Sequence, residues 1–249
     1  MLWAYVRLYG FVLRRAGNDL RVDYGLLTRI SGTIPMQRIQ ALTISENPLH
    51  RFFGRVSVHV DTAGGHGGEA QQKRREPIAP LVDRANLAAL IGGLVPSVTL
   101  HDIEWQPVHP RAVRRALVRT LFVATCASFL IISTLRAIPE IALGLLFGWA
   151  VLYAWKFVAH LGWAFAGDAL VFRSGWLWRQ VTIARFSKVQ VVNRRESPFD
   201  RRLGMASVTV DTAAASAGHA LVIPFLAAGT ASKLAATLSR HAAQTAFKW

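Results

Sequence analysis

The sequence predicts a membrane protein of the α+β class, in which a transmembrane helical hairpin joins two copies of a small, basic, β-rich domain. Two apolar runs near the middle of the 249-residue chain predict the hairpin. A gapless internal repeat on either side of these runs predicts the duplicated domain. The formal charge of +15, mostly from arginine, predicts an anionic partner.

The apolar residues are concentrated in one part of the chain. Hydrophobic residues make up 52% of the sequence and charged residues 17%, whereas about a quarter of an ordinary soluble domain is charged. The single cysteine, Cys126, lies inside an apolar run, which excludes an intramolecular disulfide, a CxxC motif and a thiolate metal site. No pair among the eight histidines has metal-ligand spacing beside carboxylates, so we expect no cofactor.

Two consecutive apolar runs predict the hairpin. The first, Leu117–Leu135, carries one charge, and the second is long enough if it is counted from Ile138 to Phe157. A helix needs roughly 17 to 25 apolar residues to cross the hydrocarbon. Pro139 predicts the turn between the runs. The alternative is a helical hairpin buried in a soluble core, but two such runs are too long for a chain of this size to bury. The aromatic residues that suit a membrane interface are Trp149, Tyr153, Trp155 and Trp163.

The charges that flank the runs predict the orientation. Four arginines lie before or at the start of the first span and Lys156 follows the second, while Arg136 and Glu140 cancel in the loop between them. Cytoplasmic flanks collect lysine and arginine, so we expect both ends of the hairpin to face the cytoplasm. We expect no cleavable signal peptide, because the apolar stretch at the start is short and contains Arg7.

The internal repeat aligns residues 20–64 with residues 170–214 at a constant offset of 150, and about 15 of the 45 pairs are identical. Each copy ends its aligned stretch in Asp-Thr-Ala, and a second match follows at 78–81 and 223–226. One repeat therefore occupies each side of the hairpin. The identical pairs include Gly25/Gly175, Arg29/Arg179, Gln40/Gln190, Glu46/Glu196, Pro48/Pro198, Arg51/Arg201 and Gly54/Gly204.

Each repeat is predicted to be a set of strands followed by one amphipathic helix. Alternation of Val56, Val58 and Val60 with polar residues predicts a strand with one buried face. The closing helices are expected at 81–91 and at 231–243, the second behind a cap at Thr230. The other strands are expected at 10–15, 19–24 and 39–46. The resulting division is a first domain at 1–97, a basic linker at 98–116, the hairpin at 117–165 and a second domain at 166–249.

These motifs resemble the bacterial pleckstrin-homology (PH) domain membrane proteins of the YdbS/YdbT-like type. The carrying segments are 25–29, 34–35, 38–40, 48–51, 54 and 58–64 in the first copy, and 175, 179, 188–190, 198, 201, 204 and 208–213 in the second. The resemblance implies PH-like domains, each a bent antiparallel sheet of about seven strands closed by a C-terminal helix. It also implies a multi-pass protein of the bacterial cytoplasmic (inner) membrane, with both domains cytoplasmic and no catalytic residues.

Two features depart from that family pattern. Ala184-Arg185 replaces Ile34-Pro35 in the second copy, so we expect a different turn there. Longer members of the family carry spans before a domain like the first one, and residues 1–9 look like the end of such a span.

The charge is uneven between the repeats. Residues 1–108 hold 12 basic and 9 acidic groups, whereas residues 170–249 hold 11 and 3. If Arg179, Lys188 and Arg201 converge at one rim of the sheet, each could contribute about 1 kcal/mol to binding anionic headgroups. Three interpretations stay open: a charge bias that only fixes topology, contact with lipid headgroups, and an acidic protein partner. The candidate binding residues are Arg179, Arg185, Lys188, Arg194, Arg195, Arg201 and Arg202, with Arg29, Arg38 and Arg51 in the first repeat.

The sequence gives little support for nucleic-acid binding or for catalysis. Nucleic-acid modules interleave aromatic and basic residues, and this cluster has only Phe186 and Phe199, so we expect no nucleic acid. The Asp-Thr pairs at 61–62 and 211–212 lie at strand ends, which favours loop capping over catalysis. We therefore expect a non-enzymatic scaffold or interaction module whose partners are membrane lipid and another protein or a second copy. The alternative is an accessory subunit of a transporter or protease.

Overall fold

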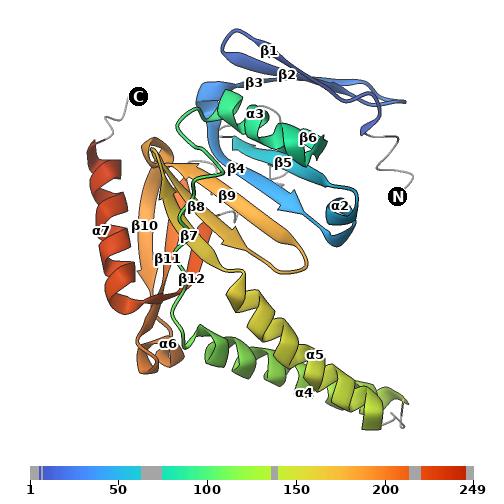
Figure 1. Cartoon of the computed structure of the whole chain (residues 1–249), viewed down its shortest axis with the longest axis vertical. Helices are drawn as coiled ribbons and strands as arrows, with labels where there is room; N and C mark the ends of the chain where they lie inside the picture. Colours follow the sequence, from blue (N-terminus) through green and yellow to red (C-terminus); the bar gives the residue numbers. More distant parts are fainter. Residues whose placement is uncertain (1–5, 7, 63–74, 136–139, 213–219, 245–249) are drawn as a thin grey trace.

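The computed structural model describes residues 6, 8–62, 75–135, 140–212 and 220–244. Two β-rich domains lie side by side, and a helical hairpin projects from the base of the second (Figure 1). The expected turn at Pro139 lies outside the described residues, as does most of the N-terminal segment that resembles the end of a span. The bent sheets and closing helices confirm two PH-like domains on either side of a helical hairpin.

The two repeats have the same order of elements. Each has an antiparallel three-strand meander, a one-turn 3-10 helix, and three more strands with a short helix between the first two, before a closing helix. In the first repeat these are β1 (Val12–Ala16), β2 (Asp19–Tyr24), β3 (Ile30–Pro35), η1 (Met36–Arg38), β4 (Ile39–Glu46), α2 (Pro48–Phe52), β5 (Arg55–Thr62), β6 (Arg75–Asp83) and α3 (Arg84–Leu94). In the second they are β7 (Gly162–Ala166), β8 (Ala169–Ser174), β9 (Arg179–Arg185), η2 (Phe186–Lys188), β10 (Val189–Arg195), α6 (Pro198–Arg202), β11 (Met205–Thr212), β12 (Leu221–Ala227) and α7 (Ala228–Gln244).

One sheet runs through both domains. β4 pairs antiparallel with β9, from Ala41 opposite Ala184 to Glu46 opposite Arg179, which makes a six-stranded sheet in the order β6-β5-β4-β9-β8-β7. The core of the first domain therefore includes Val171 and Ile183 from the second. We call this pairing of β4 with β9 the joint between the repeats, and the sequence did not predict it.

Glycine is required at the turn between the second and third strands of each repeat. Gly25 has φ of +114° and Gly175 has φ of +79°, a region that residues with a Cβ rarely adopt. A Cβ on Gly25 would lie 2.0 Å from the carbonyl oxygen of Thr28, and one on Gly175 would lie 1.9 Å from that of Trp178. The identical glycines therefore set the same turn twice.

The short helices α2 and α6 are capped by side chains. Asn47 accepts a hydrogen bond from the backbone N–H of His50 at 2.7 Å, and Ser197 forms a capping box with Asp200. Pro48 and Pro198 occupy the first turn, where no backbone donor is needed. These caps explain why a helix of five residues forms between two strands.

The hairpin consists of α4 (Ala112–Leu135) and α5 (Glu140–Ala159). Each contains a window apolar enough to cross a membrane, and only 17% of each window is buried by the rest of the protein. Core helices of a soluble protein would be mostly buried, so the exposed apolar surface supports membrane helices. The buried contacts include the small residues Ala124, Ser128, Ala150 and Ala154, which let two helices approach closely.

Several expected boundaries differ in the structure. α4 begins before Leu117, and α5 ends at Ala159, so that residues 162–165 form part of β7 and not of the hairpin. Trp163 is consequently 5% exposed in the core of the second domain and does not lie at a membrane interface. The closing helices start at Arg84 and Ala228, so Thr230 lies inside α7 and is not its cap. The strands β3 and β9 were not predicted, and neither were the strands β6 and β12 that precede the closing helices.

The linker closes an open side of the second domain. Gln106 bridges to Trp163 on β7, and the backbone N–H of His109 donates to the carbonyl of Phe225 on β12 at 2.8 Å. The linker thus contacts strands of both sheets of that domain, and it covers strand edges that would otherwise be open.

Candidate membrane-facing and inter-repeat sites

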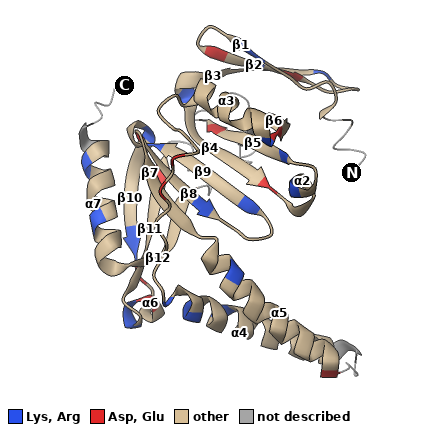
Figure 2. Ribbon diagram, viewed as in Figure 1, with Lys and Arg blue, Asp and Glu red and all other residues tan. Residues whose placement is uncertain are grey.

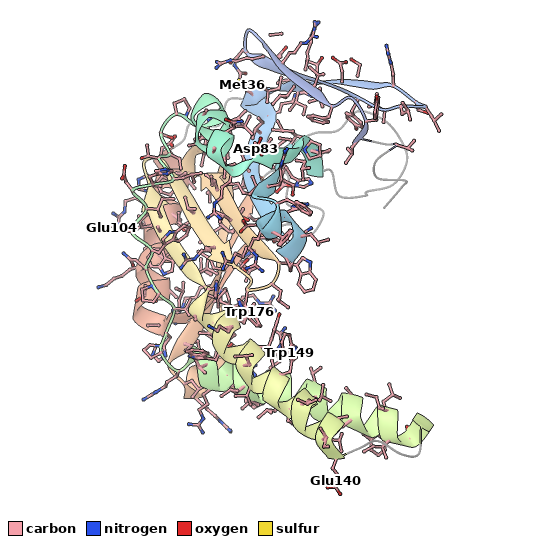
Figure 3. The ribbon with its side chains drawn as sticks, turned by 45° about the vertical axis from the view of Figure 1, so that its right-hand side comes forward. Met36, Asp83, Glu104, Glu140, Trp149 and Trp176 are labelled. Carbon is pink, nitrogen blue, oxygen red and sulfur yellow. The ribbon has the colours of Figure 1, made fainter. Side chains whose placement is uncertain are left out.

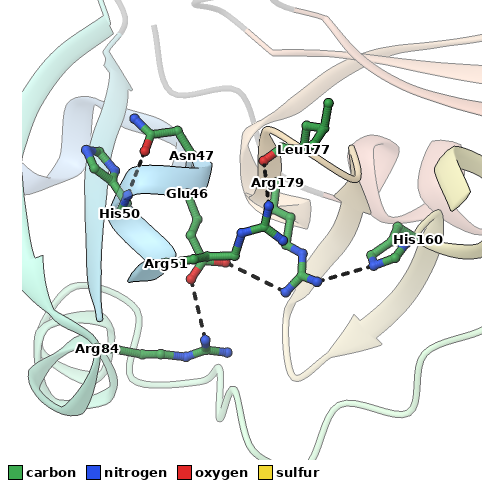
Figure 4. Close-up of polar contacts among 8 residues, drawn as sticks. All are labelled: Glu46, Asn47, His50, Arg51, Arg84, His160, Leu177 and Arg179. Carbon is green, nitrogen blue, oxygen red and sulfur yellow. Dashed lines mark hydrogen bonds and ion pairs between the residues drawn. The ribbon is translucent and has the colours of Figure 1, made fainter. Parts of the chain in front are cut away.

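An ionic contact crosses the joint between the repeats (Figure 4). Glu46 ends β4, and its side chain is only 11% exposed. One carboxylate oxygen lies 3.4 Å from Nη1 of Arg84, and the other lies 3.9 Å from Nη1 of Arg179. Arg179 also lies 3.3 Å from Nε2 of His160, just beyond α5. The first repeat is thereby connected to the base of the hairpin.

Three more of the predicted binding residues also bridge the repeats. Arg51 on α2 donates to the carbonyl of Leu177 in the β8–β9 turn at 3.2 Å. Arg185 donates to the carbonyl of Leu94 at the end of α3. Lys188 donates to the carbonyl of Gln37 at 2.8 Å. With Arg179, these residues hold the two domains together.

The condition that Arg179, Lys188 and Arg201 converge on one rim of the sheet is not met in the structure. Arg179 begins β9, Lys188 lies in η2 beyond the other end of that strand, and Arg201 lies on α6. These three residues lie in one arginine-rich stretch of the sequence. That stretch covers several structural elements, and the fold places the residues apart.

The remaining candidates occupy separate surfaces. Arg194 pairs with Glu196, and Arg195 is exposed on the same strand, β10. Arg29 and Arg38 are exposed on the first repeat. Arg201 and Arg202 are exposed on α6, close to the start of α4 (Figure 2).

A basic pocket of about 270 Å³ lies where α6 meets the base of the hairpin. Arg115 forms an ion pair with Asp200 at 3.4 Å, and its guanidinium lies 5.0 Å from the centre of the Phe199 ring. Arg114 and Arg202 are exposed, and no carboxylate pairs with either among the described residues. The sequence indicated the charge at the start of α4 but not its contact with α6. The pocket is lined by Arg114, Arg115, Val118, Phe199, Arg202 and Leu203.

Aromatic side chains join the second domain to the membrane helix. Trp176, in the β8–β9 turn, lies 5.7 Å from Trp149 and 6.4 Å from Tyr153 on α5, measured between ring centres (Figure 3). Nζ of Lys156 lies 4.8 Å from the ring of Trp155. Tryptophan, tyrosine and lysine in this arrangement are typical of a membrane–water interface.

Burial lowers the pKa of one arginine, Arg173, near the base of the hairpin. Arg173 packs its guanidinium 4.7 Å from the ring of Trp105 and donates to the carbonyl of His160 at 3.2 Å. Desolvation lowers the pKa of Arg173, and the positive charge of Arg179 lowers it further. Glu46 supplies the opposite charge for Arg179, which reduces the repulsion between these two arginines.

The described residues contain no group of three histidine, cysteine, aspartate or glutamate side chains that could hold a metal ion. Cys126 lies exposed on the apolar surface of α4.

Comparison with known proteins agrees with this architecture. The model of the bacterial PH domain family matches residues 1–94 and 117–242. The chain belongs to the bacterial PH domain family. No solved structure matches it significantly.

A relative of this bacterial PH domain protein is the UPF0699 transmembrane protein YdbT of Bacillus subtilis (strain 168). It is 27% identical over 222 residues, which cover 86% of the present chain and 42% of the relative. The chain thus spans about two fifths of that relative's length. The family match and this similarity confirm the resemblance inferred from the repeated motifs.

Proposed function

We propose that this bacterial PH domain protein is a non-enzymatic scaffold that holds two domains as one rigid unit against the cytoplasmic leaflet of the bacterial inner membrane. The observation that carries the proposal is the six-stranded sheet between the repeats. A flexible tether would let two domains move independently, whereas a shared sheet and core fix their spacing and orientation. Two domains with a fixed spacing and orientation can hold partner proteins in fixed positions relative to each other.

The distribution of charge supports the cytoplasmic orientation. Arg111, Arg114 and Arg115 lie at one end of the hairpin together with Lys156, and Glu140 lies at the other end (Figure 2). Segments rich in arginine and lysine are retained in the cytoplasm. The hairpin crosses the membrane twice and places both PH domains on that side.

Exposed apolar side chains support contact between the domains and the leaflet. Trp178 in the β8–β9 turn is 65% exposed, and Phe52 on α2 is 83% exposed. Both elements lie on the side toward which the hairpin projects (Figure 1). At a membrane interface these side chains would enter the headgroup region, whereas in water they would remain an unfavourable exposed surface.

The basic pocket at the base of the hairpin supports a second role, the binding of anionic lipid. Arg114 and Arg202 supply two positive charges at the level where the membrane helix begins. Val118 and Phe199 supply an apolar floor that suits the first part of an acyl chain. The class of ligand is a phosphate-bearing lipid headgroup.

Recovery of neighbours from the membrane tests the scaffold. The full chain is purified in mild detergent after crosslinking in intact cells, beside a variant with Ile183→Asp, which breaks the shared core. We expect a defined set of membrane or peripheral proteins with the native chain and their loss with the variant, provided that the variant still inserts. A transporter or protease in stoichiometric amount favours the accessory role. Recovery of lipid alone overturns the scaffold.

A further inference from the structure

An apolar pocket of about 430 Å³ lies where the second domain meets α5. Its walls are the β8–β9 turn, part of β12 and the last two turns of α5, and it shares no residue with the basic pocket. Leu161 and Phe172 form its floor, because they line the pocket and are only 3% and 6% exposed. None of the described residues that line it carries a charge. Its size falls in the range of about 300–1,000 Å³ that small-molecule sites occupy.

Aromatic rings surround this pocket, which we call the aromatic pocket. Tyr153 and Phe157 stack on α5 with their ring centres 6.0 Å apart, and Trp176 lies beside them in the β8–β9 turn (Figure 3). Trp178 also lines the pocket but is 65% exposed, so it lies at the mouth. Aromatic side chains offer large apolar surfaces, and together these rings suit an apolar ligand.

The β8–β9 turn does not itself require its two tryptophans. The first repeat makes the same turn around a glycine, but Leu26 and Thr28 stand where the second repeat has Trp176 and Trp178. Both tryptophan rings line the pocket. Their presence is explained if the pocket holds an apolar molecule.

Helix α5 places the pocket wall at the boundary of the membrane. Glu140 begins α5, and Phe157 lies about 25 Å further along the helix at a rise of about 1.5 Å per residue. The hydrocarbon of a bilayer is about 30 Å thick. Trp155 and Lys156, which suit the membrane–water interface, lie in the same turn of the helix as Phe157. Lipid acyl chains are therefore the apolar molecules closest to the mouth.

We propose that the aromatic pocket binds one acyl chain of a phospholipid from the leaflet beside the second domain. The chain enters at Trp178, and its methyl end lies against Leu161 and Phe172. Ser174 and Gln180 are paired at the end of the β8–β9 ladder next to the turn, so their hydroxyl and amide groups can donate to the ester carbonyl near the mouth. Binding of the chain removes the apolar pocket wall from water. The proposal rests on the placement of the second domain beside the leaflet and does not depend on a protein partner of the scaffold.

Photolabelling of the full chain in nanodiscs tests the site. The nanodiscs contain phosphatidylcholine with a trace of phosphatidylcholine that carries a diazirine at the methyl end of one acyl chain. After irradiation, mass spectrometry should find label on Leu161 and Phe172, in addition to Phe129, which is 77% exposed on α4. A diazirine next to the ester should instead label Trp178. The zwitterionic headgroup has no net charge, so attraction to the basic pocket does not produce the label on the floor.

A matched pair of variants separates the pocket from the lipid around the helices. Val222 lines the pocket on β12 and is 45% exposed, so Val222→Trp should fill the mouth and lower the labelling of Phe172 several-fold relative to Phe129. Val191 on β10 is 47% exposed and does not line the pocket, so Val191→Trp should leave that ratio unchanged. Label on Phe129 without label on Phe172 overturns the proposal, and so does a ratio that Val222→Trp does not change.

The same probe taken up by native membranes distinguishes lipid from protein as the occupant. Phe172 should be labelled there as it is in nanodiscs. A protein segment that fills the pocket in native membranes would exclude the label, and that result also overturns the proposal. Because Phe129 reports insertion in the same sample, none of these failures affects the hairpin or the scaffold.

Discussion

The carboxylate of Glu46 lies 3.9 Å from the guanidinium of Arg179, and these two residues belong to different repeats of the chain. The pair sits at the end of the β4–β9 ladder, where the first domain reaches the base of the hairpin. Partly exposed ion pairs contribute little to stability. Most of the stability of the joint must therefore come from the buried apolar residues next to the ion pair. A substitution at one of these residues tests this.

Leu42→Ala should weaken the joint strongly. Leu42 is 1% exposed in the core shared by the repeats, and truncation of a buried leucine costs about 2–5 kcal/mol. Its counterpart Val192 is half-buried on β10, an end strand of its sheet that packs against α7, so Val192→Ala should cost about 1 kcal/mol. The thermal midpoint of each purified variant in detergent measures the difference. Equal shifts for the two variants would contradict a joint built around β4.

The turn glycines give a second prediction. Gly25→Ala and Gly175→Ala place a Cβ against a backbone carbonyl at positive φ, so each should destabilise the fold by about 1–3 kcal/mol. Gly92 in α3 is exposed, and no neighbour lies within 4 Å of an added Cβ. Gly92→Ala should therefore raise stability by roughly 0.5–1 kcal/mol. Unfolding midpoints in detergent measure all three, and a neutral Gly175→Ala would show that the turn can relax.

The repeat and the hairpin could be predicted because both leave a linear signal in the sequence. The fifteen identities at one offset and the two long apolar runs can be found without any knowledge of tertiary contacts. The joint could not be found in the same way, because Arg179 and Arg185 look like Arg194 and Arg195 until the fold places them. A signal existed in the difference between the copies. β4 is apolar at Leu42 and Ile44, where β10 has Val192 and Arg194, as expected of a central strand and an edge strand.

The orientation of the hairpin gives a third prediction. In a Cys126→Ser background, Glu140→Cys should react with a membrane-impermeant maleimide added outside intact spheroplasts, because Glu140 lies at the end of the hairpin away from the domains. Asp102→Cys in the exposed linker should react only after lysis. Labelling of Asp102→Cys before lysis would place the domains outside and would remove the cytoplasmic assignment.

The basic pocket at the hairpin base gives a fourth prediction, which concerns retained lipid. Arg114→Gln with Arg202→Gln removes two unpaired charges from the pocket, each of which contributes about 1 kcal/mol near an anionic surface. The double variant should retain roughly ten- to thirtyfold less phosphatidylglycerol when the full chain is released from nanodiscs and weighed by native mass spectrometry.

Arg240→Gln on α7, an exposed arginine of the same domain, serves as the matched control and should retain lipid as the native chain does. The full chain is needed because the second domain shares its sheet with the first, so the isolated domain would expose the β9 edge. Equal loss from both variants would show that net charge, and not this pocket, attracts the lipid.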